Sequence, residues 1–240
     1  MIELGRSSGR FARVGHRGAS ALAPENTPEA FALAVELGCD MLEFDVLAVS
    51  DGTLVVAHDS RRLRDPSVVT LDEALAFCAD RLPGIGLQVD LKRRGIELAV
   101  VEALRRHGVL ERSWVSGFDA DALRRVAALE PDLPRSFTMP RDRFGISKRG
   151  PLAPLVRGGL RTVGASLPHR ISAVLERARA TALTLHHSVA SADAIDRAHE
   201  LGAPVYVWTV DDPKLAERLV RWGADGIITN DPRVLTGLTT

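Results

Sequence analysis

The stretch Leu42-Glu43-Phe44-Asp45-Val46 alternates apolar residues with carboxylates, and the interpretation of the whole chain starts from it. In a β-strand, residues i and i+2 point the same way, so Glu43 and Asp45 project from one face, with Cα atoms roughly 6 to 7 Å apart. Leu42 and Phe44 face the other side. On a solvated face such acids would be unremarkable. Inside a closed barrel, two inward carboxylates need a cation or a hydrogen-bonding partner to offset their burial.

Similar β-rich runs recur along the chain, and an alanine- and leucine-rich helical pattern follows each of them. We expect strands near residues 12–16, 41–46, 86–91, 113–117, 133–138, 182–186, 204–209 and 226–229. This α/β alternation predicts a parallel sheet wound with helices, and eight units favour a closed TIM-type (β/α)8 barrel over an open sheet. Between about 139 and 180 we expect extra helix and loop, although a strand at 161–165 would instead make nine.

Local signals indicate where the helices and turns lie. Thr27 is a candidate N-cap, and Gly38 ends the helix that it opens. Thr70, followed three residues later by Glu73, has the pattern of a capping box. Asp51-Gly52 joins two β-like runs as a hairpin.

Composition limits the classes of partner. The 240 residues fit one domain, and 31 basic residues against 31 acidic ones leave no net charge to attract nucleic acid or an anionic membrane.

The sequence has no apolar signal core near its start and no run long enough to span a bilayer, so we expect a cytoplasmic protein without membrane insertion. The cysteines, Cys39 and Cys78, match no metal spacing and are expected to be buried thiols. The oligomeric state stays open.

Polar residues stand where the expected strands end, and in a barrel the catalytic groups gather at that mouth. The residues in such positions are His16, Arg17, Glu43, Asp45, Asp90, Lys92, Ser116 and Trp208. Asp90 could supply a third carboxylate beside Glu43 and Asp45, and an all-oxygen set suits Mg²⁺ or Ca²⁺ rather than Zn²⁺. Glu25 could add a further ligand or orient one.

Two of the seven histidines have a context that indicates chemistry. His16 and His58 each follow a β-like run and adjoin a polar residue that could position the ring. Histidines exchange protons near neutral pH, so two of them flanking a carboxylate metal site describe a hydrolase better than a binding module. Three others, His107, His169 and His199, are interpreted as structural. Of the remaining pair, His186 and His187, one could border the pocket.

Three other side chains suggest how a substrate could be held. Arg17 and Lys92 balance the acidic cluster and could also grip a phosphate, Arg17 through its planar fork and Lys92 as a point charge. Trp208 would ordinarily be a core aromatic, but at a strand end it can roof an active site and pack against an apolar substrate face.

The ordered motifs resemble the glycerophosphodiester phosphodiesterase family. In the N-terminal part they are His16-Arg17-Gly18, Pro24-Glu25-Asn26-Thr27, Glu43-Phe44-Asp45-Val46, Asp51-Gly52 and His58-Asp59. Farther on they are Val89-Asp90-Leu91-Lys92, Ser116-Gly117-Phe118-Asp119, Val207-Trp208-Thr209-Val210 and Asp225-Gly226-Ile227-Ile228-Thr229-Asn230-Asp231-Pro232. The resemblance runs from about residue 12 to 233, which is the expected core of the domain.

The resemblance implies a TIM-type barrel and the metal-dependent hydrolysis of glycerophosphodiesters, which are small molecules, to glycerol 3-phosphate and an alcohol. It implies that His16 and His58 are the acid/base pair. It also implies a divalent cation, Mg²⁺ or Ca²⁺, on Glu43, Asp45 and Asp90. The phosphate would contact Arg17 and Lys92, with Glu25 close to the metal or to His16.

The chain departs from the family pattern at two places. Asp90 replaces the usual glutamate, so its shorter arm must bring a metal nearer to that strand or reach it through water. Only residues 60–69 separate His58-Asp59 from the next helix, where many bacterial members carry a longer insertion, so we expect a shortened or absent cap and a more open site. Alternatives are therefore a same-barrel phosphodiesterase for lysophospholipids or sugar phosphodiesters, and a catalytically silent barrel that binds a phosphorylated ligand.

Overall fold

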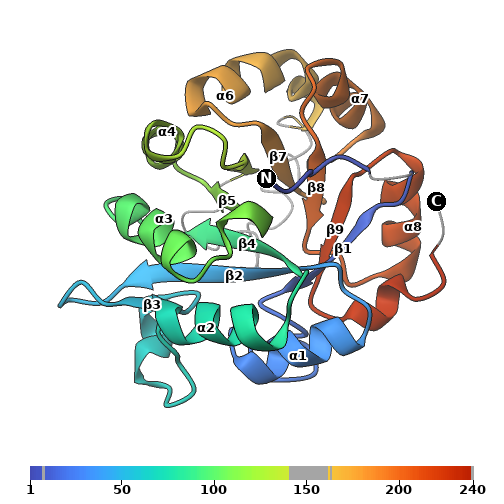
Figure 1. The fold of residues 1–240 in the computed structure, drawn as a ribbon. Helices are drawn as coiled ribbons and strands as arrows, with labels where there is room; N and C mark the ends of the chain where they lie inside the picture. Colours follow the sequence, from blue (N-terminus) through green and yellow to red (C-terminus); the bar gives the residue numbers. More distant parts are fainter. Residues whose placement is uncertain (7–8, 141–161, 163, 239–240) are drawn as a thin grey trace, which may run out of the picture.

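The computed structural model describes residues 1–6, 9–140, 162 and 164–238, and within them eight parallel strands close into a barrel (Figure 1). The barrel strands are β1 (Ala12–His16), β2 (Met41–Ala48), β4 (Gly86–Leu91), β5 (Ser113–Gly117), β6 (Arg135–Met139), β7 (Ala182–His186), β8 (Val205–Trp208) and β9 (Gly226–Thr229). The ring closes because β1 pairs with both β9 and β2. The predicted TIM-type barrel is confirmed.

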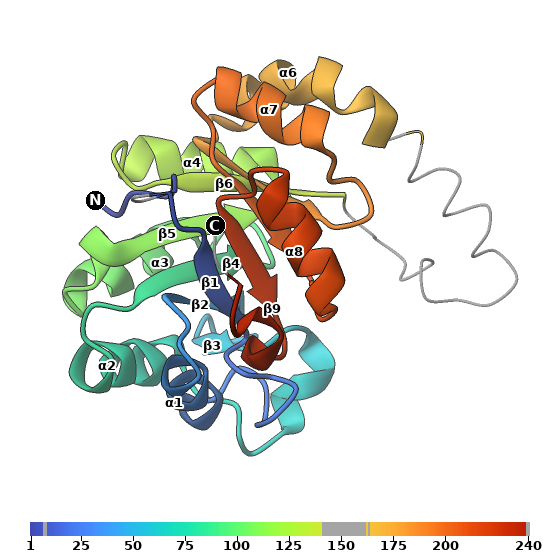
Figure 2. The ribbon, with the colours of Figure 1, turned by 90° about the vertical axis from the view of Figure 1, so that its right-hand side faces the viewer.

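Helices surround the strands in both views (Figure 1; Figure 2). They are α1 (Pro28–Glu36), α2 (Leu71–Arg81), α3 (Glu97–Arg106), α4 (Ala120–Leu129), α6 (Ile171–Ala178), α7 (Ala192–Glu200) and α8 (Pro213–Arg221). Each lies between two consecutive barrel strands in the chain, as the alternating pattern predicts. No helix in the described ranges is both long enough and apolar enough to cross a membrane.

Two details of the expected strands differ in the structure. Strand β6 begins at Arg135 rather than at residue 133, because Pro134 has no N–H to give to the sheet. The carbonyl of Pro134 instead accepts a hydrogen bond from Val115 N at 3.0 Å. The alternative strand at 161–165 is wrong, because the residues of it that are described, 162, 164 and 165, are helical. Most of the interval before β7 lies outside the described residues.

The predicted caps and hairpin are confirmed. Thr27 caps α1 by accepting a hydrogen bond from Ala30 N. The side chain of Thr70 accepts one from Glu73 N, and Glu73 accepts in return from Thr70 N, which completes a capping box. Strand β3 (Leu54–Val56) runs antiparallel to β2 and is joined to it through Gly52, whose φ of +90° is a conformation that favours glycine.

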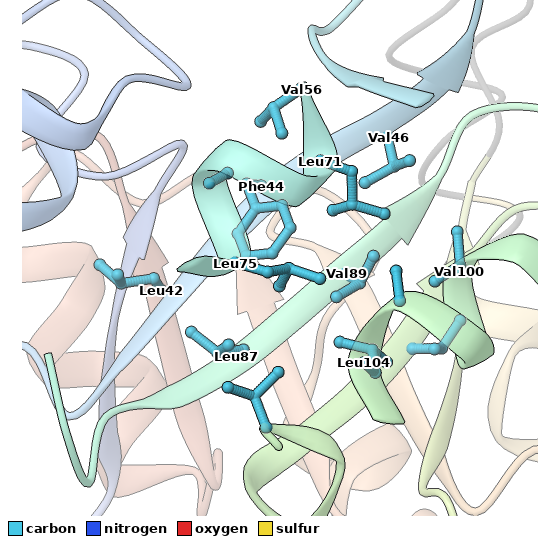
Figure 3. Packing of buried hydrophobic residues seen from close by; sticks show 14 of the residues in the cluster. Leu42, Phe44, Val46, Val56, Leu71, Leu75, Leu87, Val89, Val100 and Leu104 are labelled. Carbon is cyan, nitrogen blue, oxygen red and sulfur yellow. The ribbon is translucent and has the colours of Figure 1, made fainter. Parts of the chain in front are cut away.

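Alternation along β2 separates the core from the site. Phe44 and Val46 face outward and pack with Leu71 and Leu75 of α2 in one buried cluster (Figure 3). This burial supplies the main free-energy gain that holds helix against barrel. Glu43 and Asp45, which alternate with Phe44 and Val46 along the strand, face the barrel interior, as predicted.

The amino-terminal end of the barrel is filled by apolar side chains. Trp114 and Tyr206 stack at 4.7 Å between ring centroids, and the Tyr206 hydroxyl donates to Leu4 O at 3.0 Å. Gly226 lies against this layer, and a Cβ there would stand 2.2 Å from the Tyr206 ring, so only glycine fits. With this end filled, the opposite mouth is where polar groups gather.

Candidate active site

A pocket of about 400 Å³, counting its part open to solvent, lies at the carboxyl ends of the strands. Most of the site residues predicted from the sequence line it: His16, Arg17, Glu43, His58, Asp90, Lys92 and Trp208. Asp45 and Glu25 do not line it but contact Arg17. Residues up to 192 positions apart are thus brought together at one mouth of the barrel.

Three carboxylates form a compact group beside the pocket. Asp45 on β2 and Asp90 on β4 are partners in the strand register, and Glu43 stands one inward position earlier on β2. One oxygen from each lies within 4.8 Å of the other two, and all three residues are buried. An all-oxygen set of this kind has the ligand chemistry that Mg²⁺ and Ca²⁺ prefer.

Cationic side chains contact the same group. Lys92 Nζ lies 2.6 Å from Asp90 Oδ2 and also contacts Asp45. Arg17 Nε lies 2.9 Å from Asp45 Oδ2, and its Nη1 donates to Glu25 Oε2 at 2.8 Å. Glu25 is therefore connected to the three carboxylates through its ion pair with Arg17.

The balance of charge favours a bound cation. Burial, and after it the charge of Asp45, raises the pKa of Glu43 well above its usual range. Burial would also raise the pKa of Asp45, but Lys92 and Arg17 together hold it below its usual value. With Glu25 and its partner Arg62 included, this group of described residues has four acidic and three basic side chains. The acids are Glu25, Glu43, Asp45 and Asp90, and the bases are Arg17, Arg62 and Lys92. A divalent cation would supply the missing positive charge and keep Glu43 ionised, so the residues fit such an ion.

The loop between β1 and α1 holds Arg17 in a left-handed conformation, with φ of +57°. This conformation is costly for a residue with a side chain. In this conformation the backbone N–H of Arg17 donates a hydrogen bond to Glu43 Oε2 at 3.1 Å. Gly18 follows with φ of +78°, where a Cβ would stand 2.5 Å from the Ala30 carbonyl carbon. The His16-Arg17-Gly18 sequence therefore serves a tight turn that places Arg17 over the acids.

His16 is oriented by Asn230, whose role the sequence did not indicate. Asn230 Nδ2 donates to Asp211 Oδ2 at 2.6 Å, so its carbonyl oxygen faces His16 Nδ1, also at 2.6 Å. His16 Nδ1 must then carry the proton, which leaves Nε2 as the acceptor, 3.9 Å from Glu43 Oε2. Burial, followed by the charge of Arg17, lowers the pKa of His16 to about 4. The ring is therefore neutral at pH 7.

His58 lies on the more open side of the pocket. It follows β3, and its side chain is 42% exposed, with Nδ1 at 3.5 Å from Asp59 Oδ2. Burial lowers the pKa of His58, although Asp45 opposes this shift. Two imidazoles thus border one pocket, an enclosed one from the end of β1 and an accessible one from the loop after β3.

None of the other five histidines, all of which lie within the described residues, lines this pocket. His107 pairs with Asp72, and His199 with Asp225, each at 2.7 Å and away from the pocket. His186 packs edge-on against Trp208, with ring centroids 5.1 Å apart.

Sequence reasoning did not identify three polar residues that also line the pocket, Gln88, Thr138 and Thr184. All three stand on inward positions of barrel strands. For Gln88 the sequence did carry a signal: this residue precedes Asp90 by two positions and therefore lies on the same face of the strand.

A family model, described as the glycerophosphoryl diester phosphodiesterase family, matches residues 16–70 and 68–234. The glycerophosphodiester phosphodiesterase of Caldanaerobacter subterraneus is 28% identical over 259 residues, which cover 94% of this chain and 96% of that protein. A glycerophosphodiester phosphodiesterase of Arabidopsis thaliana is 24% identical over 244 residues and is covered to 71% of its length, against 93% of this chain.

Solved structures share the barrel. A phosphodiesterase from Oleispira antarctica, in complex with the product sn-glycerol-3-phosphate, has a TM-score of 0.72 at 24% identity, covering 94% of this chain and 95% of that one. The glycerophosphodiester phosphodiesterase of Thermotoga maritima has a TM-score of 0.69 at 23% identity, with 95% and 98% covered. At these identities the likeness establishes the fold.

Proposed function

Because this chain belongs to the glycerophosphoryl diester phosphodiesterase family and is thereby a phosphodiesterase, we propose that it hydrolyses glycerophosphodiesters to glycerol 3-phosphate and an alcohol in this pocket. One observation carries the proposal: two histidines border a single pocket beside three clustered, buried carboxylates. The product bound to the Oleispira antarctica phosphodiesterase is sn-glycerol-3-phosphate, which agrees with it.

Glu43, Asp45 and Asp90 are the residues that would hold a divalent cation, Mg²⁺ or Ca²⁺. When bound, such an ion offsets the negative charge of the phosphodiester and polarises its phosphorus–oxygen bonds. Ser116 Oγ donates to Asp90 Oδ1 at 2.6 Å, which fixes the short arm of this aspartate. The replacement of the family's glutamate by Asp90 therefore leaves a rigid ligand.

Arg17 and Lys92 would bind the phosphate. Both line the pocket, and both stay protonated because their acidic partners raise their pKa values against the effect of burial. Charges fixed in advance stabilise the additional negative charge of the transition state without costly reorganisation. Trp208, on the same pocket, would contact the carbon skeleton of the substrate.

His16 and His58 would move the protons. One imidazole accepts the proton of the attacking oxygen, and the other donates a proton to the departing alcohol, so that no strongly basic alkoxide is released. For His16 the nitrogen that takes part is Nε2, since Nδ1 is held by Asn230. Acid/base catalysis of this kind contributes about 10² to 10⁴ in rate.

The test is hydrolysis of glycerophosphocholine with added Mg²⁺ or Ca²⁺, followed by coupled detection of glycerol 3-phosphate. We expect turnover with either ion and its loss after complete chelation by EDTA. Turnover that persists in a metal-free enzyme would reject the carboxylate group as a catalytic metal site.

A second candidate is a phosphodiesterase of the same barrel that acts on lysophospholipids or sugar phosphodiesters. It is favoured by the short connection after His58, where the only regular element before α2 in these described residues is one 3₁₀ segment, Ser60–Arg64. A panel containing lysophosphatidylcholine and a sugar phosphodiester distinguishes the two by the substrate with the highest kcat/KM.

A further inference from the structure

Apart from Arg17 Nε, which is ion-paired with Asp45, three buried polar atoms of residues that line the pocket have no hydrogen-bond partner in the part of the chain that the structure describes. They are Gln88 Oε1, Thr138 Oγ1 and Trp208 Nε1. Gln88 is only 2% exposed and Thr138 only 5%. Buried polar groups in folded proteins are nearly always paired, because losing water without a replacement costs free energy. Three such atoms around one pocket indicate a ligand that supplies their partners.

The orientation of Gln88 is set by the metal-site aspartate. Ser116 Oγ must donate to the carboxylate Asp90 Oδ1, so its own oxygen is left as an acceptor. Gln88 Nε2 donates a hydrogen bond to this Ser116 oxygen at 3.0 Å. The amide cannot be flipped without losing this hydrogen bond, and Gln88 Oε1 is therefore available only as an acceptor of a ligand's O–H or N–H.

Trp208 offers the opposite polarity. Its indole Nε1–H can only donate. The ring is held edge-on against Phe118, with centroids 5.9 Å apart, and against His186. Phe118 also lines the pocket, so an apolar wall stands beside the donor.

Resting on the function proposed above, we propose that Gln88, Thr138 and Trp208 form a subsite for the free hydroxyl groups of the glycerol arm. A hydroxyl both donates and accepts, so it can give its proton to Gln88 Oε1 and accept from Trp208 Nε1, with Thr138 serving in either sense. A phosphate oxygen only accepts and cannot satisfy Gln88. A quaternary ammonium headgroup can neither donate nor accept a hydrogen bond. The subsite therefore selects a neutral polyol and places the glycerol, rather than the headgroup, against these residues.

The experiment compares two choline phosphodiesters by choline release. One is glycerophosphocholine; the other is the ester of propane-1,2-diol, which keeps the hydroxyl next to the phosphate and lacks only the terminal one. Esterified choline has no hydroxyl, so any discrimination arises from the glycerol arm. We expect wild-type kcat/KM to favour glycerophosphocholine.

Thr138→Val removes one hydroxyl at nearly constant volume and should reduce that preference about 3- to 10-fold, mainly by slowing glycerophosphocholine hydrolysis. Trp208→Phe should act in the same direction.

Ser113→Ala is the matched control. Ser113 also lies on a barrel strand, β5, is buried and does not line the pocket, and its hydroxyl donates to the backbone carbonyl of Val109 at 2.7 Å. This variant should change both substrates equally. An unchanged substrate preference in both Thr138→Val and Trp208→Phe, while the wild type hydrolyses both esters, would overturn the subsite alone. A wild type that hydrolyses neither ester would overturn the proposed function and the subsite with it.

Discussion

His16 depends on a side chain 214 residues away, because Asn230 fixes which of its nitrogens carries the proton. Asp211 in turn fixes the amide of Asn230. This chain of hydrogen bonds holds one tautomer and one ring orientation before any substrate arrives. Its contribution should therefore appear in catalysis rather than in stability.

Replacing Asn230 with leucine tests this arrangement. The variant keeps the branched shape of the side chain but removes its carbonyl oxygen and so frees His16 Nδ1, and we therefore expect kcat to fall on the order of 10-fold or more with KM nearly unchanged. Steady-state kinetics with glycerophosphocholine gives both values. The matched control is Ser20→Ala, which removes the other hydrogen bond to the same Asn230 oxygen, at 2.9 Å. Equal losses in the two variants would contradict a specific role for the His16 contact.

The two cysteines should be inert while the protein is folded. Burial raises the pKa of both Cys39 and Cys78 to about 12, so at pH 8 about one part in ten thousand of each is the reactive thiolate. A chromogenic disulfide reagent should detect no thiol in the native protein and two per chain in guanidinium. Rapid reaction of either cysteine in the native protein would show that the helices over the barrel open more readily than this packing implies.

At the scale of elements, the helix termini follow local rules. Thr70→Ala removes the capping box of α2 and should lower the free energy of unfolding by about 1 kcal/mol, measured by urea denaturation. Thr70→Ser keeps the hydroxyl and should retain most of that stability. Because Thr70 does not line the pocket, kcat should stay the same in both. A stability loss as large for serine as for alanine would mean that the methyl group, not the cap, matters.

Local rules also explain how much could be predicted from the sequence. The strand of Glu43 and Asp45, its inward face and the cap at Thr27 follow from neighbours a few positions apart. The orientation of Gln88 could not be predicted, because it depends on Ser116 in the next strand and on the strand register. Asn230 was visible in its motif, but its contact with His16 exists only once β1 and β9 close the barrel.

At the scale of the whole molecule, closure of the barrel concentrates acids that the unfolded chain keeps apart. A divalent cation should therefore bind the folded state selectively and raise the melting temperature. At 100 times Kd the rise should be roughly 5 to 10 °C, measured by differential scanning calorimetry. Asp90→Asn should abolish most of this rise, whereas Asn at the exposed Asp132 should not. An equal rise in both variants would place cation binding elsewhere.

The most direct test of the account is glycerol 3-phosphate release by His16→Ala and His58→Ala, with circular dichroism to verify the fold and His107→Ala as a histidine variant remote from the pocket. We expect each pocket variant to lose at least about 100-fold in kcat while His107→Ala keeps wild-type turnover. Near-wild-type turnover in folded His16→Ala and His58→Ala would contradict the claim that these two imidazoles, on either side of one carboxylate-held cation, perform the hydrolysis.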